Sequence, residues 1–407
     1  MKKQVVIIGG GPAGLAAAIR LCEKGVTDIL VIEREHRPGG ILRQCIHDGF
    51  GLTRFGESLS GPEYAQRFID RAESLGIEIV TDATVIDADA RRHISYVCRN
   101  GLACVEADAV ILAMGCRERT RGAISTPGSR PAGVYTAGAA QHYINLQNIM
   151  VGHKAVILGS GDIGMIMARR LTLEGADVSA VFEVQPYASG LPRNVEQCLN
   201  DYNIPLFLSH TLTKIHGKDR LTGVTAAACD AQMRPIPGTE KFWPCDTLIL
   251  SVGLIPENEL SRSAGVELDS RTQGAVVDEH FQTSVPGYFA AGNVLHVHDL
   301  VDFVSLEAEA LADSVSRYLA ESLPAGNSLD IIAGCAVGHV LPQHAGGIEE
   351  FTLSLRVETP MRPCRVVVTQ DGIVVGKRTL PKALPAEMIQ LKVKPVSTQN
   401  KIEVNVR

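Results

Sequence analysis

The chain has 407 residues, of which 45% are hydrophobic, and its formal net charge at pH 7 is −6. This length allows two or three globular domains, and an acidic balance without a long basic run argues against nucleic acid or an anionic membrane as the main partner. No stretch approaches the roughly 20 apolar residues of a membrane-spanning helix, and the first residues lead into a predicted strand rather than a signal peptide. We therefore expect a cytoplasmic protein without a membrane span.

The first predicted element is a buried strand, Val5–Ile8, which runs into the glycine turn Gly9–Gly14 and then into a helix. A glycine turn between a strand and a helix leaves backbone N–H groups and the positive helix end available to a pyrophosphate. Glu33 ends the next apolar strand, near the spacing at which a carboxylate accepts ribose hydroxyls. The predicted ligand contacts of this unit are Gly9, Gly11, Pro12, Ala13, Gly14 and Glu33.

The same arrangement returns later in the chain. Strand Ala155–Leu158 runs into the glycine turn Gly159–Gly164, and Glu183 follows the next apolar strand. In both copies the acid lies 24 residues after the first glycine, and in both an Asp, a buried strand and a glycine close the unit. The repeat predicts two Rossmann-like folds that hold two dinucleotides face to face. The second set of predicted contacts is Gly159, Gly161, Gly164 and Glu183, with Gly253 at the end of its closing strand. Gly115 is the corresponding predicted contact at the end of the closing strand of the first unit.

The remaining segments indicate how these units are joined. A linker rich in Gly, Pro, Arg and Thr covers about 117–134, and a short apolar segment at 287–294 precedes a helix at about 305–319. This second pattern indicates that the chain returns to complete the first domain. Short alternating strands from about 325 predict a small all-β domain, which serves either to dock a partner or as a structural cap. The predicted fold is α/β, with domains at 1–123 with 251–324, at 124–250, and at 325–407.

The ten cysteines show neither a Cys-x-x-Cys pair nor the spacing of a metal cluster. Cys98 and Cys104 flank a predicted hairpin turn, and we expect them to face each other across it. Most of the cysteines are expected to be reduced core residues.

These motifs resemble flavoproteins with two dinucleotide-binding domains, the pyridine nucleotide-disulfide oxidoreductase superfamily, over residues 1 to about 322. The stretches at 39–51, 159–164 and 245–258 are similar to a narrower group of subunits or neighbours of glycerol-3-phosphate dehydrogenase-like enzymes. That group includes the opine oxidase and hydrogen cyanide synthase subunits. The resemblance implies FAD in the first site, within a domain split by the second, and NAD in the second site.

The resemblance also implies roles for single residues. Gly9, Gly11 and Gly14 would surround the FAD pyrophosphate, with Gly40 in the same site, and Glu33 would bind the adenosine ribose. Gly292 and Asn293 would meet the ribityl and phosphate part, where the superfamily usually has Gly-Asp. The Asn293 amide oxygen is expected to accept a hydroxyl proton, more weakly than a carboxylate.

The second site carries an unusual acid. Asp162 lies inside the glycine turn, where its charge favours the helix end but opposes an incoming pyrophosphate. An empty, structural second unit is therefore an alternative. If NAD binds, Glu183 favours it over NADP, since a carboxylate suits a 2′-hydroxyl and repels a 2′-phosphate.

One thiol lies where the superfamily's disulfide reductases carry a cysteine pair. Cys45 stands between Arg43 and His47, a setting that is expected to lower a thiol pKa. Cys45 and His47 are therefore candidate catalytic residues, and a thiol packed beside the cofactor without chemistry is the alternative.

A polar cluster of His296, His298, Asp299 and Asp302 follows Asn293. Two His and two Asp can bind a metal, but we favour hydrogen bonding or proton handling at the flavin by His298, and helix capping by Asp302. No metal site is predicted.

The sequence thus predicts a FAD-dependent oxidoreductase that passes electrons between NAD(H) and an acceptor. It would be one part of a dehydrogenase complex, in which a companion subunit uses a small-molecule substrate. One alternative is a self-contained NADH oxidase or peroxidase that uses Cys45. The other is a flavin-bearing scaffold subunit with an empty second site.

Overall fold

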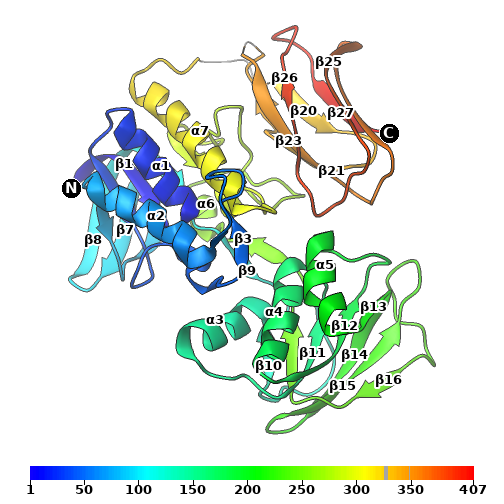
Figure 1. The fold of residues 1–407 in the computed structure, drawn as a ribbon. Coiled ribbons are helices and arrows are strands. Elements are labelled where there is room, and N and C mark those ends of the chain that lie inside the picture. Colours follow the sequence, from blue (N-terminus) through cyan, green and yellow to red (C-terminus); the bar gives the residue numbers. More distant parts are fainter. Residues whose placement is uncertain (325–328, 348) are drawn as a thin grey trace. The chain divides into compact units, whose positions relative to one another are not determined.

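The computed structural model describes residues 1–324, 329–347 and 349–407 (Figure 1). Contacts divide the chain into two compact units, Met1–Cys116 with Pro256–Arg407, and Arg117–Ile255. The domain limits predicted from the sequence are 123/124 and 250/251. The predicted first residue of the C-terminal domain, residue 325, lies outside the described residues. Among the described helices, none is long and apolar enough to cross a membrane.

The first unit is built on a sheet of order β5-β2-β1-β8-β7-β6, with β19 paired to β8. β19 runs parallel to β8, with Tyr288 beside Val110 and Ala290 beside Leu112, so the returning chain completes this sheet as predicted. The two-residue turn between β7 and β8 pairs Cys98 with Gly101 and Cys104 with Ser95, so the prediction that these cysteines face each other is wrong. The strands are β1 (Lys2–Ile8), β2 (Ile29–Ile32), β5 (Glu78–Val80), β6 (Thr84–Ala88), β7 (His93–Cys98), β8 (Gly101–Leu112) and β19 (Tyr288–Ala290).

Both faces of this sheet are covered, which explains why its central strands are continuously apolar. Successive side chains of a strand point to opposite faces, so Val5 and Ile7 pack against the helices while Val6 and Ile8 enter a second core. Figure 1 shows α1 beside α2 and α7 on the helical face, where all three contribute to one apolar core. These helices are α1 (Pro12–Glu23), α2 (Gly61–Ser74) and α7 (Val301–Leu319).

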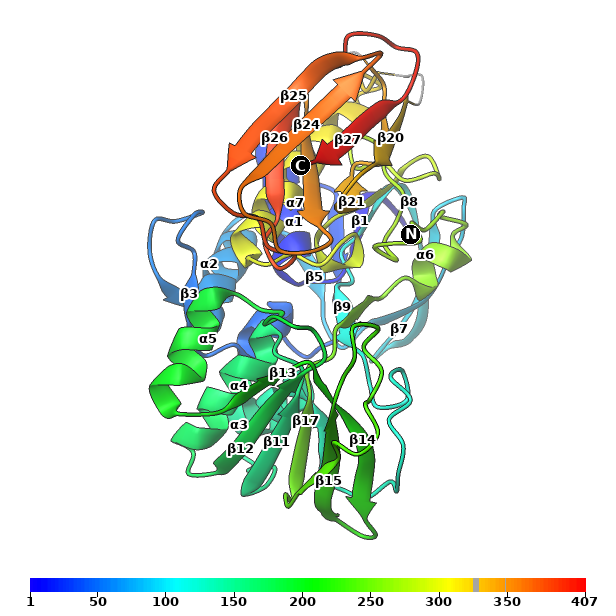
Figure 2. The same ribbon diagram turned by 90° about the vertical axis from the view of Figure 1, so that its right-hand side faces the viewer.

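The second unit has a parallel sheet of order β10-β17-β11-β12-β13. Figure 2 shows helices α3, α4 and α5 on one side of this sheet and strands β14 and β15 on the other, and each side has its own apolar core. The antiparallel sheet β14-β15-β16 was not anticipated from the sequence. The elements are β10 (Val134–Thr136), α3 (Ala137–Gln147), β11 (Lys154–Leu158), α4 (Asp162–Leu173), β12 (Asp177–Glu183), α5 (Pro192–Cys198), β13 (Leu206–Leu208), β14 (His210–Gly217), β15 (Leu221–Ala228), β16 (Lys241–Trp243) and β17 (Thr247–Leu250).

The C-terminal segment forms two small sheets around an apolar core of their own, in the order β22-β20-β27-β24-β25 and β21-β23-β26. The short alternating strands predicted after residue 325 are therefore confirmed. The strands are β20 (Leu329–Ala333), β21 (Val337–Leu341), β22 (His344–Ala345), β23 (Phe351–Val357), β24 (Cys364–Gln370), β25 (Ile373–Leu380), β26 (Ile389–Val393) and β27 (Ile402–Val406).

Shorter elements connect these parts. They are the 3-10 helices η1 (Gly40–Gln44), η2 (Asn200–Tyr202) and η3 (Gly292–Val294), the helix α6 (Glu259–Ser263), and the strand pairs β3 (Asp48–Phe50) with β4 (Leu59–Ser60) and β9 (Cys116–Glu118) with β18 (Leu254–Pro256).

Candidate nucleotide-binding sites

The first glycine turn lies between β1 and α1 and requires glycine at two positions. Gly9 has φ +110°, and a Cβ there would lie 2.4 Å from the carbonyl oxygen of Ala113. A Cβ on Gly14 would lie 1.9 Å from the carbonyl oxygen of Gly9. Neither residue can be replaced without moving the backbone, so the turn has the tight geometry that the sequence predicts.

This turn also leaves room for a ligand. Gly11 is the N-cap of α1 and has no side-chain cap, and a Cβ built on it meets only the Gly40 Cα, at 3.9 Å. The first N–H groups of a helix need partners from outside it, and Pro12 starts the helix without needing one. The end of α1 therefore fits the phosphate oxygens of a dinucleotide.

Two distant glycines border the first turn. A Cβ on Gly40 would lie 3.1 Å from the Gly11 Cα, and a Cβ on Gly292 would lie 3.0 Å from the Ala13 Cβ. The structure therefore brings Gly40 and Gly292 to the same turn. Gly115 lies after β8 with φ +70° and no atom within 4 Å of its Cβ position.

Glu33 keeps part of its carboxylate available. It is buried directly after β2, and its Oε2 accepts the Gly10 N–H at 2.7 Å while Oε1 accepts the Glu35 N–H at 2.8 Å. A carboxylate has about four acceptor positions. These two hydrogen bonds orient the side chain and leave acceptor capacity for ribose hydroxyls.

The second glycine turn is built in the same way. Gly159 has φ +96°, and a Cβ there would lie 2.0 Å from the Ser251 carbonyl oxygen. A Cβ on Gly164 would lie 2.6 Å from the Ser251 Cβ, and Gly161 is the N-cap of α4, without a side-chain cap. Gly253, also predicted for this unit, has φ +102° and no neighbour closer than the Arg119 side chain at 3.6 Å.

Hydrogen bonds within the protein occupy many of the donors and acceptors of the second turn. The Glu183 Oε2 accepts the N–H and hydroxyl of Ser160, at 3.0 and 2.6 Å, and the hydroxyl of Ser189. Its Oε1 accepts the Gln185 N–H at 3.0 Å. The Gly164 N–H donates to the Ser251 hydroxyl at 3.1 Å. Glu183 therefore has less acceptor capacity left than Glu33.

Asp162 holds a loop across the start of α4. Its Oδ1 accepts the Leu191 N–H at 2.8 Å and the Asn194 side-chain amide at 2.6 Å. The Gly190 N–H, in the same loop, donates to the Ser160 carbonyl at 3.0 Å. The Asp162 carboxylate thus has hydrogen-bond donors within the protein, which explains how an acid is accommodated inside the glycine turn.

The returning segment places Asn293 beside His298. The Asn293 Oδ1 accepts the backbone N–H of His298 at 3.0 Å and lies 3.3 Å from its Nδ1. Its Nδ2 lies 3.7 Å from the Cys116 Sγ. The amide oxygen therefore already has partners within the protein, which weakens the expectation that it accepts a ligand hydroxyl and leaves the amide N–H groups as the better contact.

Only some residues of the polar cluster predicted after Asn293 lie together. His296 and His298 come together on Glu307, which sequence reasoning did not select. Asp302 is buried and accepts the N–H groups of Gly51 and Arg54, at 3.2 and 3.3 Å, whereas the N-cap of α7 is Leu300. The prediction that Asp302 caps the helix is therefore wrong, because its carboxylate faces the β3–β4 loop.

The electrostatics of this cluster follow from its burial. Burial lowers the pKa of His296, and the neighbouring His298 acts in the same direction. Burial acts to raise the pKa of Glu307, but its interactions with His298 and His296 outweigh this and hold that pKa well below its usual range. Glu307 is therefore a carboxylate throughout the neutral pH range.

Cys45 is the C-cap residue of η1. Burial raises its pKa to about 12, and its Sγ lies 3.4 Å from the Ile41 carbonyl oxygen. The His47 ring packs on Phe50, with 5.0 Å between ring centroids. The prediction of a lowered thiol pKa is therefore wrong, since desolvation dominates the site.

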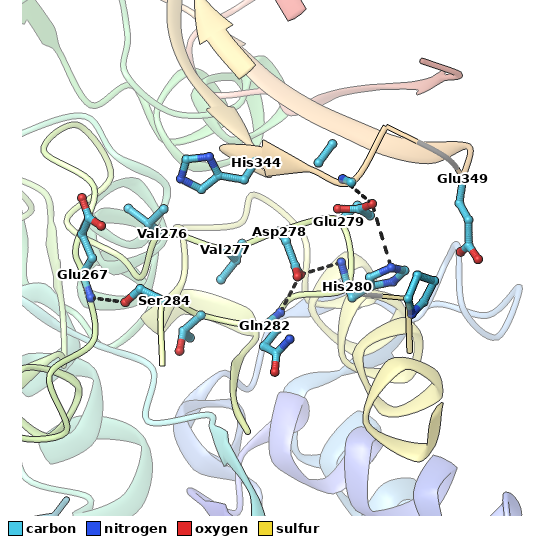
Figure 3. Close-up of a pocket in the computed structure, with 14 residues that line it drawn as sticks. Glu267, Val276, Val277, Asp278, Glu279, His280, Gln282, Ser284, His344 and Glu349 are labelled. Carbon is cyan, nitrogen blue, oxygen red and sulfur yellow. Dashed lines mark hydrogen bonds and ion pairs between the residues drawn. The ribbon is translucent and has the colours of Figure 1, made fainter. Parts of the chain in front are cut away.

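A separate cavity of about 290 Å³ lies in the first unit (Figure 3). Two of its acids have backbone partners: Asp278 accepts the N–H groups of His280 and Gln282, each at 2.9 Å, and Glu279 accepts the Gly346 N–H at 2.7 Å. These carboxylates stabilise turns, and the cavity includes none of the predicted ligand contacts.

Comparison with known proteins adds to this geometry. Residues 3–309 match the family model described as pyridine nucleotide-disulphide oxidoreductase. The chain belongs to this family. Its enzymes are FAD-dependent NAD(P)H oxidoreductases, so the predicted family, enzyme class and cofactors are confirmed.

Curated relatives include components of two enzymes. Hydrogen cyanide synthase subunit HcnB of Pseudomonas protegens is 28% identical over 72% of this chain and 66% of its own length. An opine oxidase subunit of Agrobacterium tumefaciens is 25% identical over 71% of this chain and 60% of its own. The chain thus spans less than two thirds of the length of each.

Among solved structures, thioredoxin reductase from T. acidophilum aligns with a TM-score of 0.65 and 24% identity. The alignment covers 79% of this chain and 99% of that protein. This likeness confirms the predicted α/β fold with two Rossmann-like domains.

Proposed function

We propose that this protein is a flavoprotein subunit that passes electrons between NAD(H) and an acceptor within a dehydrogenase complex. A companion subunit would oxidise a small hydroxy or amino substrate. The names of the two curated relatives support the subunit role, since one is a subunit of hydrogen cyanide synthase and the other a subunit of opine oxidase.

FAD is assigned to the first glycine turn. The observation that carries this assignment is the uncapped start of α1, where Gly11 leaves open space and Glu33 has acceptor capacity to spare. Phosphate groups bind the N–H groups at such a helix end, and a carboxylate after the neighbouring strand binds the adenosine ribose. Gly40 and Gly292 border the same turn and allow the close approach of a ligand.

NAD is assigned to the second glycine turn. Gly159, Gly161 and Gly164 build the turn, and Glu183 stands where Glu33 stands in the first unit. A carboxylate at this place favours a 2′-hydroxyl over a 2′-phosphate, so NADH rather than NADPH is the proposed donor.

The bound flavin would supply the redox chemistry, since it accepts a hydride from a nicotinamide and stores two electrons. The protein's own residues bind and orient it. The start of α7, which has no side-chain cap, offers N–H groups that favour negative charge nearby. Asp302 fixes the β3–β4 loop against this helix through Gly51 and Arg54.

A scaffold subunit with an empty second site is the second candidate. Glu183 accepts four internal donors, and the Gly164 N–H is bonded to Ser251. A Rossmann-like unit whose polar groups are hydrogen-bonded within the protein in this way can have a purely structural role.

One experiment separates these two candidates. The purified chain, alone and with its copurified companion, is mixed anaerobically with NADH or with candidate amino and hydroxy acids while flavin absorbance is followed. We expect NADH to bleach the flavin of the isolated chain, and a substrate to do so only when the companion is present. Failure of NADH in both preparations, with an active complex, would support the scaffold.

A further inference from the structure

Four polar side chains meet between η3 and the second turn of α7: Asn293, His296, His298 and Glu307. His296 is 1% exposed, and the side chains of His298 and Glu307 are 3% and 9% exposed. Buried polar atoms need hydrogen-bond partners. The partners present at each atom therefore constrain which atoms carry protons.

The orientation of Asn293 is fixed by a backbone donor. Its Oδ1 accepts the N–H of His298 at 3.0 Å, and an amide NH₂ group could not accept this bond. The atom 3.3 Å from the His298 Nδ1 is therefore an oxygen. His298 needs a proton on Nδ1 to make this contact favourable.

The second ring nitrogen of His298 also faces an acceptor. Its Nε2 lies 3.2 Å from the Glu307 Oε2, which lies 2.8 Å from the His296 Nε2. The other oxygen of Glu307 accepts the Gly292 N–H at 2.8 Å. A carboxylate that accepts several N–H donors is favoured in its ionised form, which offers no proton to His298.

A neutral imidazole has one N–H and one lone pair, so it cannot donate to both Asn293 and Glu307. One of the two contacts would then place a lone pair against an oxygen. Either a proton on each nitrogen or a metal ion between Nε2 and Oε2 removes this conflict.

The distances favour the proton. The ligand atoms of His296, His298 and Glu307 all lie within 4.8 Å of one another, a set that can hold a metal ion. Ligands bound tetrahedrally to zinc at about 2.0–2.1 Å would be separated by roughly 3.3 Å. The observed 2.8 Å at His296 is shorter than this separation, and both it and the 3.2 Å at His298 lie within the range of an N–H···O hydrogen bond.

The neighbouring charged groups are engaged elsewhere. Arg356 of β23 donates through Nη2 to the Val297 carbonyl at 2.9 Å and lies 3.7 Å from the Asp299 Oδ1. His339 of β21 lies 6.2 Å from His296 between ring centroids. Asp302 is bonded to the β3–β4 loop. Glu307 is thus the carboxylate in hydrogen-bond contact with His298.

We propose that His298 is a buried imidazolium, held by Asn293 and paired with Glu307, and that this pair sets the charge at the Gly292 end of the first glycine turn. The link to the turn is direct, because Glu307 accepts the Gly292 N–H and Gly292 adjoins Ala13. His298 is a positioning residue, and its effect on a flavin rests on the function proposed above.

The protonation state can be tested without cofactor. Nitrogen-15 NMR of the histidine-labelled full chain, with signals assigned through His298→Gln, reports both ring nitrogens of His298 at neutral pH. We expect both nitrogens to carry protons and metal analysis to find no stoichiometric ion. A lone-pair nitrogen on His298 would overturn the proposal. So would one metal ion per chain that is lost in Glu307→Gln.

The charge effect is tested through the flavin reduction potential of the holoprotein. Removing the cation in His298→Gln should lower the potential, because reduced flavin is the more negative form. Removing the anion in Glu307→Gln should raise it. The matched control is His216→Gln, a histidine of the second unit bonded to Thr225. Shifts of the same sign in both cluster variants, or no shift in either, would contradict the proposal. A chain that binds no flavin would instead refute the proposed function and leave the NMR result standing.

Discussion

The two glycine turns share a backbone design but differ in what their hydrogen bonds leave for a ligand. In the first, Glu33 accepts two backbone N–H groups, and Gly11 has open space at its Cβ position. In the second, Glu183 accepts four donors, and the Gly161 Cβ position lies 3.1 Å from the Ser251 hydroxyl. A glycine fingerprint therefore specifies the turn, whereas the side chains around it decide how readily a dinucleotide enters.

Gly11→Ala is the sharpest way to test the first turn. Gly11 has φ −78°, and its Cβ position is open, so the fold should accept alanine. The methyl group would occupy space beside the pyrophosphate, and we expect FAD affinity to fall on the order of 100-fold, or about 3 kcal/mol. Flavin titration of the refolded or apo protein measures this, with circular dichroism as the control for folding. Unchanged FAD affinity would show that the ligand does not approach α1.

Gly161→Ala is the matched change in the second turn. We expect flavin content to be retained and the rate of flavin reduction at limiting NADH to fall roughly 10-fold or more, since each tenfold loss of affinity corresponds to about 1.4 kcal/mol. Stopped-flow absorbance measures the rate. If the variant loses flavin instead, the assignment of the two sites is reversed.

Glu183→Ser should change the choice of nicotinamide cofactor. Loss of the carboxylate removes repulsion of a 2′-phosphate, so the preference for NADH over NADPH should fall roughly 10-fold, about 1.4 kcal/mol. The ratio of the two reduction rates is the readout. An unaltered ratio would mean that Glu183 only holds Ser160 and Ser189.

His339 predicts a pH dependence of stability. Burial lowers its pKa from 6.5 to about 3, with His296 and Arg356 adding to the effect. As pH falls below 6.5 the unfolded chain takes up this proton before the folded chain does, so stability is lost between about pH 6.5 and 3. Thermal unfolding across this range should show a weaker dependence in His339→Gln than in wild type. The exposed His153→Gln serves as control, and equal slopes in all three would refute the prediction.

Cys45→Ser is expected to have the smallest effect. A thiol whose pKa is raised to about 12 is almost entirely protonated at neutral pH, and the thiolate is the reactive form. NADH-dependent turnover should therefore stay within about twofold of wild type. Abolished turnover with intact flavin reduction would restore the oxidase or peroxidase hypothesis.

Sequence periodicity predicted the elements that place the sites. The buried strands, both glycine turns and the return of β19 to the first sheet follow from local apolar patterns and from glycine positions that tolerate no side chain. These features depend on short stretches of chain, so spacing alone reveals them.

Partners that are distant in sequence escaped prediction. Ser189 and Ser251 carry no recognisable pattern, yet they occupy donors and acceptors of the second turn. Glu307 had one usable signal, since it lies three residues after Val304 and four before Leu311, on an apolar stripe where an acid is rarely unpaired. Cys45 was misjudged because charge in the sequence neighbourhood does not reveal burial.

Anaerobic titration of the purified protein with NADH is the decisive test of the proposed electron transfer. We predict a yellow protein with one FAD per chain, bleached by NADH much faster than by NADPH. A folded protein that is colourless and takes up no flavin would refute the proposed function.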